Sequence, residues 1–91
     1  MTYRVILAPG AARTMQRLSG PILFALRGAI LGLSADPRPR ASRKLAALDL
    51  YRLRLRVDGV PWRIVYQVRD AERIVLVTRV ARRAEGTYRG L

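Results

Sequence analysis

The stretch YRLRLRV at residues 51–57 alternates apolar residues with arginine without a break. Strand side chains point alternately to the two faces of a sheet, so Arg52, Arg54 and Arg56 are predicted to share one face. Guanidinium groups hold phosphate through paired hydrogen bonds, and like charges side by side repel one another. The spacing therefore indicates a surface for an anionic partner or for a reaction at phosphate. The alternative is a solvated face in an arginine-rich proteome.

The composition of the chain limits the kinds of catalysis and binding that are possible. Its 91 residues include 18 Lys+Arg against six Asp+Glu, a formal net charge of +12, and no cysteine or histidine. These absences exclude disulfides, thiolate nucleophiles, Cys/His zinc sites and imidazole acid–base catalysis. The charge favours a polyanionic partner such as nucleic acid.

The order of the predicted elements defines the fold class. Length and apolar content fit a single domain over residues 1–91 with one hydrophobic core. Strand patterns occupy residues 2–8, 51–57, 62–69 and 73–81, and helical patterns occupy 11–19 and 21 to about 34, with a linker at 35–42. We predict an α+β fold of order β-α-α-β-β-β, a twisted, mainly antiparallel sheet of about four strands with two N-terminal helices packed on one face. The longest apolar stretch is too short to span a bilayer, so no membrane contact and a cytoplasmic location are expected.

The predicted second helix is apolar around most of its circumference, and Arg27 is its only charge. A helix of this kind is usually buried on more than one side. Either the sheet and the first helix cover it, or a partner chain or second copy covers one side.

Apolar pairing gives the predicted register of the strands. A loop from Asp58 to Pro61 closes the first hairpin and places Val57 opposite Trp62. The further predicted pairs are Leu55–Ile64, Leu53–Tyr66, Tyr51–Val68, Arg56–Arg63, Arg54–Val65, Arg52–Gln67, Val68–Ile74, Tyr66–Leu76, Ile64–Thr78, Trp62–Val80, Arg63–Arg79 and Val65–Val77. One face then carries Arg52, Arg54, Arg56, Arg63 and Arg79, while Tyr51, Tyr66 and Trp62 belong to the core.

The element order, together with YRLRLR, WRIVYQV, VTRVARR and the late Tyr88, resembles the RelE/ParE superfamily. These proteins are the toxin halves of type II toxin–antitoxin pairs. The resemblance spans the chain, is most specific over residues 51–88, and looks nearer the RelE branch. RelE proteins enter the ribosomal A site and cut mRNA without a metal or other cofactor, whereas the ParE branch acts on DNA gyrase.

Carried over by position, the resemblance implies roles for individual residues. The implied catalytic residues are Arg54, Arg63, Arg83 and Tyr88. The predicted RNA or phosphate contacts are Arg52, Arg56, Arg79, Arg82 and Lys44. The implied reaction is attack of the substrate 2′-hydroxyl on the adjacent phosphate, with Arg63 and Arg83 stabilising the charge that develops on phosphorus. Tyr88 would stack on a base or transfer a proton.

Arginine stands at positions 52 and 54, where RelE proteins have lysine. Because the pKa of arginine lies above about 12, it is a poor general base, and cleavage is expected to rely on positioning or on the ribosome. The expected partners are a cognate antitoxin from the adjacent gene, mRNA and the ribosomal A site. Two other functions stay open: a ParE-like inhibitor of DNA gyrase, and a non-catalytic basic module that binds RNA.

Overall fold

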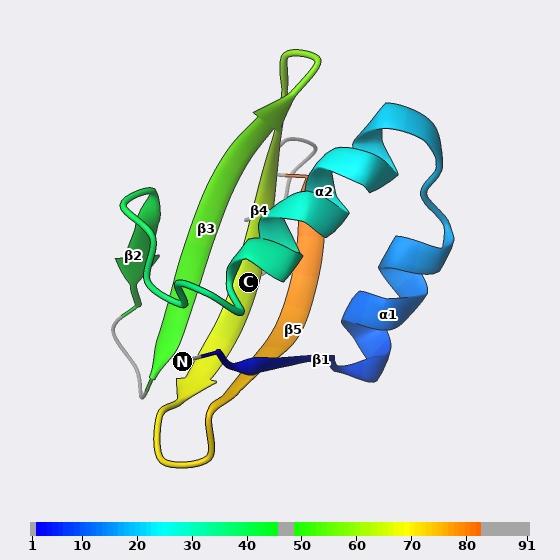
Figure 1. Ribbon diagram of the computed structural model, residues 1–91. Helices are drawn as coiled ribbons and strands as arrows, with labels where there is room; N and C mark the ends of the chain where they lie inside the picture. Colours follow the sequence, from blue (N-terminus) through cyan, green and yellow to red (C-terminus); the bar gives the residue numbers. More distant parts are fainter. Residues whose placement is uncertain (1, 46–48, 83–91) are drawn as a thin grey trace.

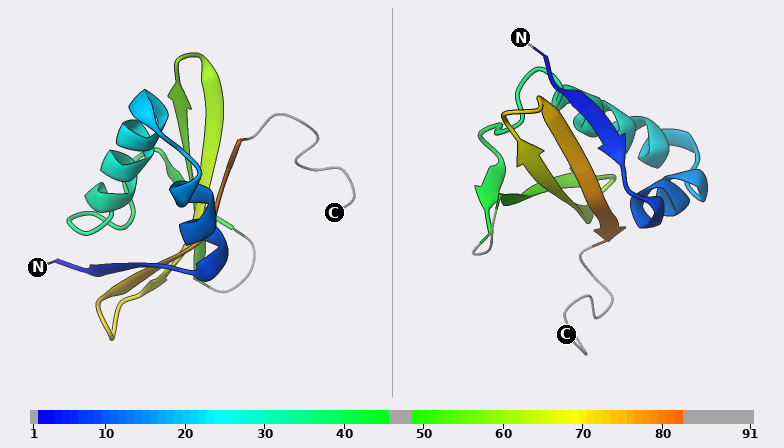
Figure 2. Two further views of the ribbon diagram at one scale, coloured as in Figure 1. Left: turned by 90° about the vertical axis from the view of Figure 1, so that its right-hand side faces the viewer. Right: turned by 90° about the horizontal axis from the view of Figure 1, so that it is seen from below.

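Two helices lie on one side of a five-stranded sheet in the computed structural model, which describes residues 2–45 and 49–82 (Figure 1). In chain order the elements are β1 (Arg4–Leu7), α1 (Pro9–Gln16), α2 (Gly20–Gly32), β2 (Ser42–Lys44), β3 (Leu50–Val57), β4 (Val60–Arg69) and β5 (Ile74–Arg82). The strands lie in the order β1-β5-β4-β3-β2, with β1 parallel to β5 and all other neighbours antiparallel. Figure 2 shows both helices on the same side of the sheet. The predicted α+β class is confirmed, with five strands in place of about four.

The additional strand is β2, which begins at the last residue of the predicted linker and was not predicted as a strand. Its three residues pair with residues 51–53 of β3, and Arg43 lies opposite Arg52. Serine, arginine and lysine carry no strong strand propensity, so pairing with an existing strand creates β2 where propensity alone does not. The other edge of the sheet is β1, whose position the sequence left open.

The core lies between the helices and the near face of the sheet. Alternate residues of β4 from Trp62 to Val68 are buried, as strand alternation requires. The rest of the hydrophobic core consists of Tyr51, Leu53 and Val57 of β3, Val75, Val77 and Val80 of β5, Ala11 and Met15 of α1, Leu26 and Ile30 of α2, and Leu33, which follows α2. The predicted core placement of Tyr51, Trp62 and Tyr66 is confirmed.

The apolar circumference of α2 is only partly covered. Leu26 and Ile30 are buried against the sheet, but Phe24 is 81% exposed and Leu31 is 59% exposed. The described part of the chain therefore leaves apolar surface on this helix open. Neither helix of that part is long and apolar enough to cross a membrane.

The hairpin between β3 and β4 closes through two residues, so the predicted four-residue loop is wrong. Asp58 and Gly59 have φ values of 50° and 80°, the conformation of a type I′ turn, which matches the twist of the strands it joins. The turn pairs Val57 with Val60 and shifts the whole register by two residues, as in Leu55–Trp62, Leu53–Ile64 and Tyr51–Tyr66. A shift of two preserves the faces, so the predicted apolar face of this hairpin is correct although its individual pairs are not.

The register between β4 and β5 also differs from the prediction, first at the turn, where Ile74 pairs with Arg69 and not with Val68, and again at an irregularity further along the strands. Tyr66 pairs with Val77 but Val65 pairs with Arg79, which leaves Thr78 as an extra residue. The Thr78 hydroxyl donates a hydrogen bond to the Val65 carbonyl at 3.2 Å. A bulge of this kind switches the alternation, so Val75, Val77 and Val80 all face the core. The predicted pair Tyr66–Leu76 is wrong because of the turn, and Arg63–Arg79 is wrong because of the turn and the bulge together.

The linker between α2 and β2 is held against the sheet by a polar cluster, which we call the Arg38 clasp. Arg38 donates to both carboxylate oxygens of Asp70, at 3.2 and 2.7 Å, and to the Tyr51 hydroxyl at 2.8 Å. The Tyr3 hydroxyl donates to Asp70 at 2.6 Å, and the Tyr66 hydroxyl donates to the Pro37 carbonyl at 2.8 Å. Hydrogen bonds from Arg38 and then Tyr3 lower the pKa of Asp70 to about 2, while burial raises the pKa of Tyr66.

The clasp predicts an acid-sensitive increment of stability. Asp70 titrates at about 2 in the folded chain and near 3.9 when unfolded, so its contribution is present above about pH 4 and is lost as the pH falls towards 2. We expect Asp70→Asn to be less stable than the wild type at pH 7 and to lose less stability between pH 4 and 2. Urea unfolding across this pH range measures both effects. The matched control Asp58→Asn, at an exposed turn position, should keep the wild-type acid response; an equally flattened response there would contradict the assignment.

Alanine substitutions at Gly59 in the turn and at Gly28 in α2 are expected to change the free energy of unfolding in opposite directions. Gly59→Ala forces an L side chain to φ 80° and should lower the free energy of unfolding by about 1 kcal/mol. Gly28→Ala in α2 meets open space around its new methyl group and should raise it by about 0.5–1 kcal/mol. Thermal and urea unfolding of the two variants test the pair, and a loss of stability in both would refute the expected contrast.

Candidate nucleic-acid interface

Six arginines lie together on the outer face of the sheet, the face opposite the helices. They occupy β2, β3, β4 and β5, and every one alternates with residues directed to the core side. The six are Arg43, Arg52, Arg54, Arg56, Arg63 and Arg79. We call this surface the arginine face. It contains all five arginines predicted from the sequence, and Arg43, which the sequence pattern did not indicate because β2 was not predicted.

The strand register sets the arginines in rows across the sheet. One row runs from Arg43 through Arg52 and Val65 to Arg79, and the next pairs Arg54 with Arg63. Neighbouring strands are about 4.8 Å apart, and outward residues along one strand are about 6.5 Å apart. The structure thus makes direct neighbours of Arg54 and Arg63, two predicted catalytic residues that the sequence register had set out of line.

The strands of the described chain contain no acidic residue. The five described acidic residues are Asp36 in the linker and Asp49, Asp58, Asp70 and Glu72 in turns. Asp70 and Glu72 form ion pairs with Arg38 and Arg69, neither of which belongs to the arginine face. Like-charged cross-strand neighbours destabilise a sheet, so a solvated structural face would be expected to intersperse acids among these arginines.

The remaining predicted site residues are placed differently. Lys44 pairs with Tyr51 and Arg82 pairs with Trp62, so alternation directs both to the side of the sheet that carries the helices. Neither is brought together with the arginine face, although both side chains are exposed. Arg83 and Tyr88 lie outside the described residues.

A shallow pocket of about 290 Å³ adjoins the hairpin end of the arginine face. Its lining residues are Arg54, Leu55, Arg56, Pro61 and Trp62. Arg56 also donates to the Gly59 carbonyl at 3.1 Å, which draws its guanidinium towards the turn. The pocket combines two cations with apolar surface, a combination suited to a nucleotide. Within the described residues, no group of three or more His, Cys, Asp and Glu side chains is placed to hold a metal ion.

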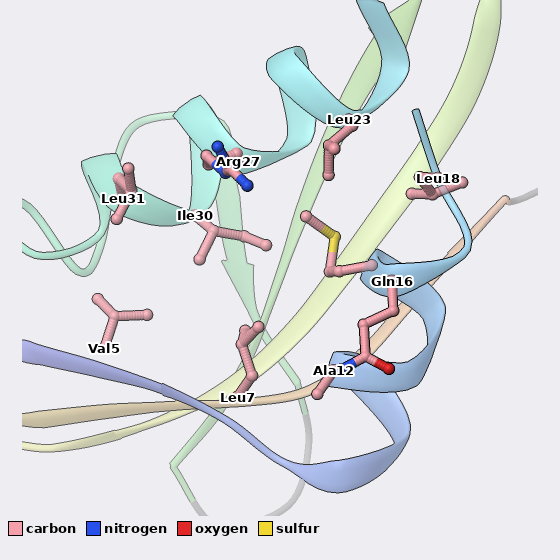
Figure 3. Close-up of a pocket in the computed structure, with 10 residues that line it drawn as sticks. Val5, Leu7, Ala12, Gln16, Leu18, Leu23, Arg27, Ile30 and Leu31 are labelled. Carbon is pink, nitrogen blue, oxygen red and sulfur yellow. The ribbon is translucent and has the colours of Figure 1, made fainter. Parts of the chain in front are cut away.

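A second concave surface lies on the opposite side of the molecule, among β1, α1 and α2 (Figure 3). We call it the apolar groove, and its volume is about 550 Å³. The lining residues are Val5, Leu7, Ala12, Met15, Gln16, Leu18, Leu23, Arg27, Ile30 and Leu31. Arg27 is the single charged residue among them. The groove explains why α2 is apolar on more sides than the sheet covers.

Comparison with known proteins assigns the chain to a family. A family model described as the ParE toxin of type II toxin–antitoxin system, parDE, matches residues 5–86. No curated protein is similar enough to the chain to count as a match.

Several solved structures share the fold over most of their length. A mutant E. coli RelE toxin in complex with a RelB antitoxin peptide is 30% identical, with a TM-score of 0.72, and the alignment covers 93% of this chain and 86% of that chain. The intact E. coli RelBE toxin–antitoxin complex is 25% identical, with a TM-score of 0.77 and coverage of 91% and 99%. The RelBE2 complex from Mycobacterium tuberculosis is 26% identical, with a TM-score of 0.75 and coverage of 91% and 100%.

The family model spans most of the chain, and the alignments with these solved structures cover 91–93% of it. The chain therefore belongs to the ParE toxin family, within the RelE/ParE superfamily of toxins from type II toxin–antitoxin systems.

Proposed function

We propose that this toxin is a ribosome-dependent endonuclease that cuts mRNA in the ribosomal A site. The observation that carries the proposal is the arginine face, a row-by-row array of guanidinium groups without a carboxylate in the described strands. Such a surface binds the backbone of an RNA strand irrespective of sequence. The similarity of the chain to solved RelE structures also supports this proposal.

The proposed reaction is a transesterification within the RNA. The 2′-oxygen forms a bond to the adjacent phosphorus while the bond from phosphorus to the 5′-oxygen breaks, giving a 2′,3′-cyclic phosphate and a 5′-hydroxyl end. Negative charge builds on the phosphoryl oxygens in the transition state, and preorganised cations stabilise it. Arg54 and Arg63 are cross-strand neighbours, close enough for both guanidiniums to contact one phosphate.

Proton transfer needs a different group, because arginine stays protonated. The chain has no histidine, and the described strands carry no carboxylate. We assign the proton transfer to Tyr88 or to groups of the ribosome, and we assign Arg83 to charge stabilisation with Arg54 and Arg63. Arg52, Arg56 and Arg79 then hold the flanking phosphates.

The toxin is proposed to be held inactive by a cognate antitoxin seated in the apolar groove. Two of the similar structures are toxin–antitoxin complexes, and a third contains an antitoxin peptide. An amphipathic segment would place apolar side chains against Leu23 and Ile30 and an acidic side chain against Arg27. Charge complementarity supports this partner, since the toxin carries +12 and no acidic residue lines the groove.

The family model itself favours a second candidate function, because its description is that of ParE. A ParE-like toxin would inhibit DNA gyrase, with the arginines contacting a protein or DNA surface instead of mRNA. Supercoiling by purified gyrase in the presence of the toxin separates the two candidates, since only the second predicts inhibition.

Mapping mRNA 5′ ends after induction of the toxin tests the proposed nuclease. We expect new ends that carry 5′-hydroxyl groups and fall within translated codons. Arg54→Ala/Arg63→Ala should reduce cleavage by at least about 100-fold, since loss of one preorganised donor costs 10²–10³ in rate. The control variant Arg13→Ala/Arg17→Ala removes the same amount of charge from two exposed positions, one in α1 and one directly after it. This variant should cleave mRNA at the wild-type level. Growth arrest without new ends would contradict the nuclease and direct the test to gyrase.

Paired substitutions on α2 test the antitoxin site. Leu31 and Phe24 are both exposed, but only Leu31 lines the apolar groove. Leu31→Lys should therefore abolish co-purification of the antitoxin, while Phe24→Lys should preserve it, and both variants should remain folded because neither side chain is buried. The opposite outcome would place the partner on the outer side of α2.

A further inference from the structure

The short strand β2 adds one cation, Arg43, to the arginines that the longer strands contribute to the arginine face. Arg43 lies directly opposite Arg52, and both belong to the outer face because their neighbours Ser42 and Lys44 pair with Leu53 and Tyr51 of the core side. Arg43 is exposed, while Arg52 is half-buried. The pair extends the arginine face to the edge of the sheet, one strand beyond β3.

Several hydrogen bonds hold this edge in place. Ser42 donates to the Pro39 carbonyl through both its backbone amide, at 2.8 Å, and its hydroxyl, at 2.7 Å. The Leu45 amide donates to the Leu50 carbonyl at 2.8 Å, which fixes the strand at its other end. The Arg38 clasp anchors the linker immediately before. Arg43 is therefore presented from an ordered strand, which lowers the entropic cost of binding an anion.

We infer that Arg43 and Arg52 form a phosphate subsite for a single-stranded RNA, at the β2 edge of the arginine face. The inference rests on the proposed function for the identity of the anion. Two guanidiniums across one strand spacing can hold one phosphate between them, each with a planar, forked donor set. The pair Arg54–Arg63 is the next row along, so a bound strand would place successive phosphates on successive rows.

The chain supplies a close control for this subsite. Lys44 is adjacent to Arg43, lies in the same strand, is exposed and carries the same charge, but it points to the other face of the sheet. A subsite formed by the outer face depends on Arg43 and not on Lys44. A general effect of net charge would depend on both equally.

The test measures binding of a fluorescently labelled single-stranded RNA to full-length toxin across a salt series. Each neutralised phosphate contributes about 0.7 to the slope of log K against log salt. Arg43→Ala should lower the slope by that amount, so its affinity falls about 2.6-fold less than that of the wild type between about 50 and about 200 mM salt. Lys44→Ala should keep the wild-type slope. Unfolding measurements on both variants verify that they stay folded.

Each outcome decides between defined alternatives. An unchanged slope in Arg43→Ala, or equal decreases in both variants, would overturn the subsite. Rejection of the subsite can be distinguished from rejection of the proposed nuclease, because mRNA end mapping measures cleavage and does not depend on the salt slope. Cleavage in cells with an unchanged slope would reject only the subsite, whereas a lowered slope without cleavage would leave an RNA-binding subsite on a toxin that is not a nuclease.

Discussion

Burial of one face of the sheet determines where the cations on the other face must lie. Side chains along β4 alternate between the two faces of the sheet, so Trp62 and Ile64 cannot both be buried without directing Arg63 outward. Each large apolar side chain of the core contributes about 1.5–3 kcal/mol, whereas a like-charged cross-strand pair costs up to about 1 kcal/mol. The core therefore outweighs the repulsion between Arg54 and Arg63. The binding surface is held in place by interactions made on its reverse side.

The faces of the central hairpin could be predicted from the sequence, but the pairs could not. Alternation alone assigns Tyr51 and Trp62 to the core, and any even shift of register keeps that assignment. The pairs depend on the turn, where the Asp58–Gly59 dipeptide closes in two residues with positive φ. In β5 the switch of alternation at Thr78 depends on a tertiary contact with Val65, which no local pattern records.

The candidate site was predictable to the same extent. Four arginines of the outer face follow from alternation, and Arg79 lies there because the bulge at Thr78 switches the alternation of β5. Arg43 could not be predicted, because three polar residues become a strand only beside β3. The same register separates Lys44 from the arginines, although the two residues are adjacent in the sequence. The family resemblance indicated the class of protein, which the family model confirms. The roles of Arg83 and Tyr88 remain predictions outside the described residues.

The parallel pairing of β1 with β5 has a consequence for how the chain acquires this structure. Arg4 and Leu7 lie beside Ile74 and Val77, so the first strand has its partner about as far along the chain as the fold allows. Contacts between such distant segments carry a high loop-closure entropy and slow folding. During synthesis β1 has no strand to join until β5 has left the ribosome. The floor of the apolar groove, which includes Val5 and Leu7, is therefore completed only when the arginine face has also gained its last strand.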